Sequence, residues 1–343
     1  MKTKFKIVSW LVVALLLATA LVGCGGGGAE PDNGDEPEVE APEKIVWKFG
    51  HLGNEDHIWN QTALKFAELV NEKTDGVIEV KVFPNEQLGN EMEVLNMIQS
   101  GTADIGISGE SMQNWAPKAA LMAVPYAFRD TAHMKSVIDS DLGGEISAQI
   151  VEKVGVKPIY YHLRAPRNLT TNEAVRTPED VKGLKMRVPN VPLFVDAWKA
   201  VGAQPQVMAF SEVFTGLQQG VIGAQENPYD LIYSAGFYEV QKYVNETEHV
   251  NGWVYVVLGQ GQFDALSDDL KAAVTEAAAE TQAFADDLFY DEIAGYKQKV
   301  QDEGMTIVDD VDKAAFQKAM EPAVKESLDE EQFDLYQRIL EFK

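Results

Sequence analysis

The chain has little cysteine and a deficit of positive charge. Its 343 residues include one Cys, and 29 Lys and Arg stand against 54 Asp and Glu, for a formal net charge of −25. A single Cys excludes a disulfide-stabilised scaffold and a Cys/His zinc module, because both need several cysteines or ligands. A generic nucleic-acid-binding protein needs a basic face that displaces counterions from phosphates, so the acidic composition excludes this class as well.

Catalytic signatures are also missing. The sequence contains no GxSxG, HExxH, CxxC or Walker motif and no complete GxGxxG. None of its five His lies four residues from another, so a helical pair of metal ligands is not available. We therefore expect a protein that is not an enzyme and that holds no metal or cofactor.

The first 24 residues indicate export. Three Lys among the first six residues precede an apolar stretch at residues 7–22, which ends in Leu21-Val22-Gly23-Cys24. This arrangement resembles a bacterial lipoprotein signal with a lipobox. The alternative is a short transmembrane anchor with a chance Cys, but the apolar stretch is brief for that role. We expect a signal peptide at residues 1–23 and a lipid anchor at Cys24.

The segment that follows has almost no side chains to bury. Residues 24–43 contain four consecutive Gly, three Pro and seven acidic residues. Such a composition predicts a disordered acidic linker. A lipid-modified Cys24 would then hold the protein at a membrane while the linker lets the folded part stand off it.

From Lys44 onward, short apolar runs alternate with helical patterns, which predicts an α/β fold with a mostly parallel sheet. A nearly Gly-free pattern from Ser267 to about Glu303 predicts one long helix, and residues 313–342 are helical and amphipathic. The predicted strands are 45–49, 77–83, 104–108, 158–163, 184–188, 207–210 and 253–258, and the first predicted helices are 58–73 and 91–99.

Arginine is unevenly distributed. Four of the six Arg fall within 24 residues, at Arg164, Arg167, Arg176 and Arg187. Arg offers a rigid planar fork that matches a carboxylate with two hydrogen bonds, whereas Lys suffices for a solvated surface. Arg187 ends the apolar run 184–188, where open α/β sheets present residues to a cleft. The alternative is a set of surface ion pairs, which contribute little to stability.

The segments around this cluster form a long and specific pattern. It comprises TPEDVKGLKMRVPN at 177–190, MAFSEVF at 208–214 and QENP at 225–228, with QLG at 87–89 and VPYAFR at 124–129. From about Lys44 to the C-terminal helices, the chain resembles the solute-binding proteins of tripartite ATP-independent periplasmic (TRAP) transporters.

The resemblance implies a two-lobed periplasmic-binding-protein-like α/β fold with an interdomain cleft and a long domain-spanning helix. Lobe I would comprise residues 44–164 plus 253–292, and lobe II residues 165–252 plus 293–343. Binding would close the lobes over a small-molecule carboxylate, and the closed form would dock onto the TRAP membrane permease subunits. The protein would be extracytoplasmic, in the periplasmic space or on the outer face of the cytoplasmic membrane.

The resemblance also implies roles for individual residues. Arg187 matches the family arginine that forms a two-pronged salt bridge with the ligand carboxylate, and Arg167 matches a second arginine. Asn227 and Asn190 match pocket asparagines, and Phe210 matches an aromatic that packs against bound ligand. Structural alternatives are a surface position for Arg167, a turn cap for Asn227 and a core position for Phe210.

Two residues of the first lobe bear on specificity. In the family, the loops after the first and third strands supply polar contacts, and here those loops offer His51 and Glu110. A Glu opposite the arginines suits donor hydroxyls and repels a second carboxylate, which favours a hydroxylated monocarboxylate such as a sugar acid. The alternative is that His51 and Glu110 pair with each other as structural groups.

Two other functions remain open from the sequence. The same family could bind a C4-dicarboxylate or a 2-oxo acid in place of a sugar acid. An extracytoplasmic enzyme could instead use Glu110 or Glu226 as general acid or base on a sugar acid.

Overall fold

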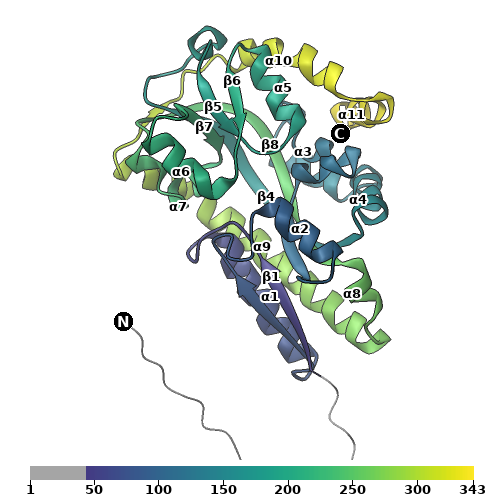
Figure 1. The fold of residues 1–343 in the computed structure, drawn as a ribbon. Coiled ribbons are helices and arrows are strands. Elements are labelled where there is room, and N and C mark those ends of the chain that lie inside the picture. The colour runs from purple at the N-terminus through teal and green to yellow at the C-terminus, as the bar shows by residue number, and fades with distance from the viewer. Residues whose placement is uncertain (1–43) are drawn as a thin grey trace, which may run out of the picture. The chain divides into compact units, whose positions relative to one another are not determined.

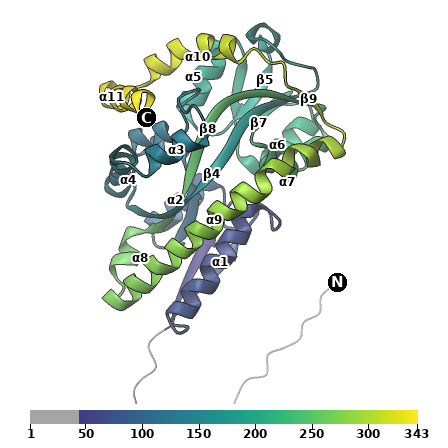
Figure 2. The same cartoon turned by 180° about the vertical axis from the view of Figure 1, so that it is seen from behind.

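The structure is a computed structural model, and it describes residues 44–343 (Figures 1 and 2). The predicted signal peptide, Cys24 and the predicted linker lie outside the described residues. Across residues 44–343, no helix combines the length and the apolar character needed to cross a membrane.

The elements follow one another in an order that alternates strands with helices. The strands are β1 (Ile45–Gly50), β2 (Ile78–Phe83), β3 (Ile105–Ser108), β4 (Val156–Thr171), β5 (Lys185–Val188), β6 (Gln204–Val207), β7 (Ala224–Asn227), β8 (Tyr243–Gly259) and β9 (Thr306–Val308). The helices are α1 (Ile58–Lys73), α2 (Glu91–Gln99), α3 (Thr131–Ile138), α4 (Asp141–Val154), α5 (Pro192–Ala200), α6 (Phe210–Gln218), α7 (Tyr229–Ser234), α8 (Gln260–Asp264), α9 (Asp268–Asp302), α10 (Lys313–Ser327) and α11 (Glu330–Glu341). Short 3₁₀ helices are η1 (Glu110–Asn114), η2 (Pro117–Ala123), η3 (Pro178–Val181) and η4 (Phe237–Glu239).

The described strands form one sheet in the order β2-β1-β3-β8-β4-β7-β5-β6, with β9 on β8. β1 pairs in parallel with β2 and β3, and β5 pairs in parallel with β6 and β7. Between these two groups, the long strands β4 and β8 pair antiparallel with each other and run through both halves of the molecule (Figure 1). The fold is therefore two-lobed, and its lobes share two strands.

The prediction of a mostly parallel sheet is right on both sides and wrong in the centre. β8 is antiparallel to β3 and β4, and β4 is antiparallel to β7. Alternating strands and helices predict parallel neighbours only where a helix connects them. β4 and β8 each cross from one lobe to the other, in opposite directions, so they meet antiparallel.

Most predicted element positions agree with the structure, including α1, α2 and the long helix α9. The predicted strand at 207–210 is wrong, because β6 ends at Val207 and Phe210 begins α6. β6 is an edge strand with the sequence QPQV and mostly exposed side chains. An exposed edge strand needs no apolar run, so the apolar run at 207–210 predicts a strand that begins three residues after the true start of β6 at Gln204.

Helix α9 links the two lobes. The Ser267 side chain accepts a hydrogen bond from the backbone of Leu270 and so caps the helix, which spans 35 residues or roughly 50 Å. It packs along α1 of the first lobe, against β4, and against α7 of the second lobe (Figure 2).

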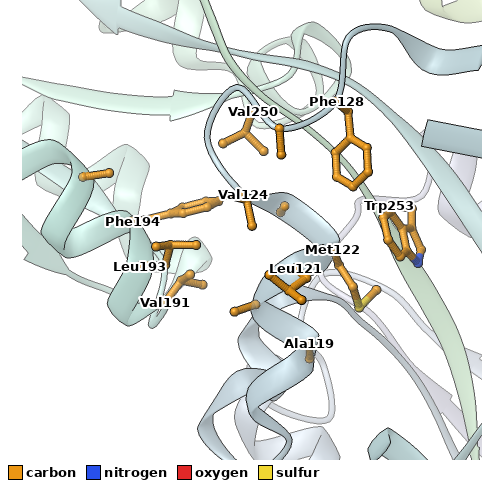
Figure 3. Close-up of a cluster of buried hydrophobic side chains, with 14 of the residues drawn as sticks. Ala119, Leu121, Met122, Val124, Phe128, Val191, Leu193, Phe194, Val250 and Trp253 are labelled. Atoms are coloured by element: carbon orange, nitrogen blue, oxygen red, sulfur yellow. The ribbon is translucent and has the colours of Figure 1, made fainter. Parts of the chain in front are cut away.

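A hydrophobic cluster supports the region where the strands cross between lobes. Figure 3 shows Leu121 and Met122 of η2 between Phe194 of α5 and Trp253 of β8. All four side chains are at most 1% exposed. Burying large side chains of this kind stabilises each by roughly 1.5–3 kcal/mol, so the crossing point is firmly packed.

Two adjacent glycines of α4 provide a test of how α4 packs against the end of α3. A Cβ at Gly143 would lie 2.2 Å from the backbone oxygen of Ile138, whereas a Cβ at Gly144 would meet nothing within 4 Å. We expect Gly143→Ala to lower the free energy of unfolding by about 1–3 kcal/mol through overpacking. Gly144→Ala should raise it by about 0.5–1 kcal/mol, because Ala favours a helix interior. Urea denaturation of both variants measures the difference, and equal effects would contradict the α3–α4 packing described.

Candidate functional site

A cleft lies between the lobes and has two connected parts. Its inner part, here called the floor, has a volume of about 50 Å³, and its outer part, here called the mouth, about 330 Å³. The two parts share Leu52, Glu91, Ser111, Arg187, Pro189 and Phe210. The floor is also lined by Trp59, Ile107, Ser108, Gly109, Glu110, Arg164, Arg167, Asn227, Leu231 and Val254.

The sheet topology brings the polar side chains of the second lobe together. Arg167 of β4, Asn227 of β7 and Arg187 of β5 lie on three neighbouring strands. Asn168, beside Arg167, pairs with Asn227, and Arg187 pairs with Gln225. From the first lobe, Glu110 lies just beyond β3, where parallel strands present residues to a crevice.

Arg187 is a buried cation that uses only one of its three guanidinium nitrogens in a hydrogen bond to the described residues. Its Nε donates to the carbonyl oxygen of Met208 at 2.9 Å, and its guanidinium carbon lies 5.8 Å from the centre of the Phe210 ring. In the described part of the chain, no carboxylate pairs with Arg187 and its two Nη atoms make no hydrogen bond. Burial lowers the pKa of Arg187 to about 10, Glu226 opposes this and Arg167 adds to it. Arg187 therefore stays charged at neutral pH and presents two donors to the floor.

Arg167 is held by an acidic partner. Its Nη2 donates to Glu226 Oε1 at 2.6 Å and to the Glu226 carbonyl at 2.7 Å, and its Nε donates to Glu226 Oε2. His249 Nε2 lies 3.0 Å from the same Oε2. Burial alone would raise the pKa of Glu226, but the Arg167 charge and the His249 hydrogen bond bring it down to about 2. Glu226 is thus a fixed anion that orients Arg167, and Arg167 Nη1 makes no hydrogen bond to any other residue of 44–343.

Arg164 and Glu110 form a second buried ion pair. Arg164 Nη1 donates to Glu110 Oε1 at 3.2 Å, and both side chains are less than a tenth exposed. Glu110 Oε2 is fully buried and has no hydrogen-bond partner within residues 44–343. A buried carboxylate oxygen without a donor is costly, so a hydrogen-bond donor at this atom would stabilise the protein.

Glu91 is an acidic side chain that lines both floor and mouth. As the first residue of α2, it accepts hydrogen bonds from Ser108 Oγ at 2.6 Å, Ser111 Oγ at 3.2 Å and the Gly109 backbone at 3.3 Å. Burial raises the pKa of Glu91, and the charge of Glu110 adds to the effect.

The other predicted residues are placed as follows. Asn227 is 2% exposed in the floor, and its Nδ2 donates to Gln225 Oε1 at 2.7 Å. Phe210 lines both floor and mouth, and Asn190 lines the mouth. His51 lies outside the lining of floor and mouth, because its Nε2 turns to Asn60 Oδ1 at 3.3 Å while Leu52 faces the cleft. Glu110 pairs with Arg164, so the alternative of a His51–Glu110 pair is wrong.

The lining residues that sequence reasoning did not assign to the site include Trp59, Glu91 and Arg164. Arg164 belongs to the arginine cluster that the sequence singles out, and Glu91 directly follows QLGN, at the start of a predicted helix. Trp59 carried no distinguishing signal, since an aromatic near a helix start is usually core.

Several polar contacts join the lobes, including the buried pair of His57 Nε2 and Asp230 Oδ2 at 3.3 Å, and three hydrogen bonds across the cleft share one pattern. In each, a side chain of the first lobe bonds a backbone group of the second. They join Asn54 Nδ2 to Ser234 O at 2.8 Å, Ser211 N to Glu86 Oε2 at 3.2 Å and Asn114 Nδ2 to Asn190 O at 3.0 Å. The cleft is therefore in a closed arrangement.

Among residues 44–343, no group of three or more His, Cys, Asp or Glu side chains is arranged to hold a metal ion. The polar side chains that line the floor carry guanidinium, carboxylate, hydroxyl and amide groups.

Comparison with known proteins gives consistent matches. Residues 49–331 match the family DctP, described as bacterial extracellular solute-binding protein, family 7. The chain is 34% identical to the 2,3-diketo-L-gulonate-binding periplasmic protein YiaO of Escherichia coli, over 81% of this chain and 85% of YiaO.

Two solved structures are also similar. One is a TRAP periplasmic solute-binding protein of Roseobacter denitrificans with bound L-galactonate (TM-score 0.85, 48% identity, 87% of this chain and 99% of that chain). The other is a TRAP periplasmic solute-binding protein of Xanthobacter autotrophicus with bound β-D-galacturonate (TM-score 0.82, 27% identity, 87% and 100%).

The Arg167–Glu226 pair predicts a defined pH dependence. Glu226 has a pKa of about 2 in the folded protein and roughly 4.3 when unfolded, so its contribution is fully present above pH ~4.5 and is lost as pH falls towards 2. Glu226→Gln should lower the free energy of unfolding at pH 7 by about 3–5 kcal/mol, since Arg167 stays buried without its counter-ion. The deficit relative to wild type should shrink between pH 4.5 and 2.5 in urea denaturation. Glu152→Gln, at an exposed pair with Lys153, is the control and should behave like wild type.

Proposed function

The chain belongs to the bacterial extracellular solute-binding proteins of family 7, the solute-binding proteins of TRAP transporters, and we propose that it captures a sugar acid in its cleft. The protein would then deliver this ligand to the TRAP membrane permease subunits. The observation that carries the proposal is the state of Arg187, a buried guanidinium with two unbonded Nη donors and no carboxylate partner among the described residues. A ligand carboxylate supplies the missing anion with two parallel hydrogen bonds.

The proposed contact set extends from this anchor. Arg167 would contribute its Nη1 to the ligand carboxylate, oriented by Glu226. Asn227 would add a hydrogen bond and Phe210 an aromatic surface. Asn190 lies at the mouth and would contact the outer end of the ligand.

Glu110 favours a hydroxylated ligand. Its buried Oε2 has no donor in the described chain, and a ligand hydroxyl could supply one. YiaO is named for a sugar acid, and the two solved relatives hold sugar acids. These points favour a hydroxylated monocarboxylate over a plain C4-dicarboxylate for this chain.

Ligand capture would work by closure of the lobes. We assign residues 44–164 plus 253–292 to lobe I and residues 165–252 plus 293–343 to lobe II. A ligand that touches Glu110 on one side and Arg187 on the other binds the closed state better than the open state, and this difference in affinity drives closure. The three hydrogen bonds across the cleft add to the stability of the closed state.

The proposal includes the location and the absence of catalysis. Export with cleavage before Cys24 would leave an extracytoplasmic protein that two acyl chains on Cys24 hold at the membrane. Glu226, committed to Arg167 and His249, is unsuited to proton transfer near neutral pH, so bound ligand would leave unaltered.

A thermal-shift screen against hexonates, hexuronates, C4-dicarboxylates and 2-oxo acids tests the proposal. A ligand at a hundred times its Kd stabilises the folded state by about 2.7 kcal/mol, which raises Tm. Sugar acids should raise the Tm of wild type, and Arg187→Ala should weaken their binding by roughly a hundredfold or more. Arg187→Lys should fall between, because it keeps the charge and loses the fork.

Arg176 provides the matched control. It is another member of the arginine cluster, about half exposed and paired with Asp310 on the surface. Arg176→Ala should respond to sugar acids like wild type. A wild type stabilised only by C4-dicarboxylates or 2-oxo acids would overturn the ligand class, and an unchanged response of Arg187→Ala would overturn the site.

A further inference from the structure

Arg164 is a guanidinium of the floor that neither the family motif nor the carboxylate anchor accounts for. We infer that Arg164 is a masked second carboxylate site, and that Glu110 covers it and thereby excludes sugar diacids from the cleft. The inference rests on the proposed function, because it assumes that one ligand carboxylate already occupies Arg187. It identifies the ion pair Arg164–Glu110 as the group that restricts the cleft to sugar acids with a single carboxylate.

The hydrogen bonds of the three floor arginines differ in a way that supports this role. Arg167 uses Nε and Nη2 on Glu226, and Arg187 uses Nε on a backbone carbonyl. Arg164 makes a single hydrogen bond, from Nη1 to Glu110 at 3.2 Å, and its Nε and Nη2 have no partner within residues 44–343. Arg164 therefore keeps two nitrogen donors available, and its third nitrogen, Nη1, bonds a single carboxylate oxygen, Glu110 Oε1.

Arg187 and Arg164 have different neighbours in the cleft. Arg187 lines both floor and mouth and lies over Phe210 of the second lobe. Arg164 lines the floor alone and lies 5.9 Å from the centre of the Trp59 ring of the first lobe. A six-carbon chain anchored at Arg187 can thus direct its other end towards Arg164 and Glu110.

The charge balance of the cleft decides which end group is tolerated there. Glu110 Oε2 is buried and lacks a donor, so a hydroxyl at the far end of the ligand gives it a hydrogen bond. A second carboxylate in the same place would face Glu110, with Glu91 nearby, and would have to compete with Glu110 for Arg164. Like charges in a desolvated cleft repel strongly, so a diacid is rejected.

Neutralising Glu110 should expose the masked site. Glu110→Gln keeps the shape of the side chain, removes its charge and leaves Arg164 without a counter-ion. A diacid can then place its second carboxylate on Arg164. If the ion pair only supported the fold, Glu110→Gln would weaken the binding of both ligand types alike.

The experiment measures Kd by isothermal titration calorimetry for L-galactonate and for galactarate, which is the same carbon chain with a carboxylate at both ends. Wild type should prefer L-galactonate. Glu110→Gln should shift the ratio of the two Kd values towards galactarate by at least about tenfold, the effect of removing one like charge from a desolvated site. The double variant Glu110→Gln, Arg164→Gln should lose this gain, because it lacks the second cation. Thermal melts without ligand confirm that each variant folds.

The outcomes separate this inference from the proposed function. If wild type binds neither sugar acid, the proposed function fails, and a gain of galactarate binding in Glu110→Gln that the double variant lacks still supports the masked site. If wild type binds galactarate as tightly as L-galactonate, the masked site is wrong. It is also wrong if the ratio of Kd values is unchanged in Glu110→Gln, or if the double variant keeps the gain.

Discussion

β4 and β8 pair antiparallel along most of their length, and this pair of strands joins the two lobes. The positions of the cleft arginines Arg164 and Arg167 depend on it, because both residues belong to β4. Arg164 lies opposite Gly252, and the register is irregular between Arg164 and Arg167. At the crossing point, a Cβ on Gly252 would lie 2.7 Å from the backbone oxygen of Met122, so only glycine allows η2 to pack there. The ladder thus sets where both arginines stand at the base of the cleft.

The cleft contains several buried charges, and their pairing explains how the site stays folded while it remains able to bind. Arg167 is neutralised by Glu226, and Arg164 is neutralised by Glu110. Pairing of buried ions limits the cost of taking them out of water. Arg187 lacks such a partner within the described residues, and the charge of Glu226 offsets only part of the pKa lowering that burial causes. A buried cation without an anionic partner, such as Arg187, is well suited to bind an anionic ligand.

The lobes are connected in two ways, by helix α9 along one side and by hydrogen bonds across the cleft. α9 packs on α1, β4 and α7 and so connects the lobes along one side, while the cleft is joined by side chain to backbone hydrogen bonds. Such hydrogen bonds contribute about 0.5–1.5 kcal/mol each, which is small compared with the core around Trp253. These hydrogen bonds are therefore a weaker connection between the lobes than the packed cluster of Leu121, Met122, Phe194 and Trp253.

The amino-acid sequence by itself determined the element pattern, the two-lobed family and the position of Arg187 at the end of a strand. These features depend on local periodicity, caps and a long contiguous motif, all of which are readable along the chain. The antiparallel centre of the sheet was not readable, because an apolar run predicts where a strand lies and not the direction in which it pairs. The edge strand β6 was not readable, because its exposed side chains leave no apolar run. The tertiary structure alone decided which charges pair: Arg164 with Glu110 across 54 residues and Arg167 with Glu226 across 59. It also turned His51 towards Asn60 and brought Glu91 into the cleft. Partners so far apart in sequence are chosen by the packing of the lobes, and no local pattern records that choice.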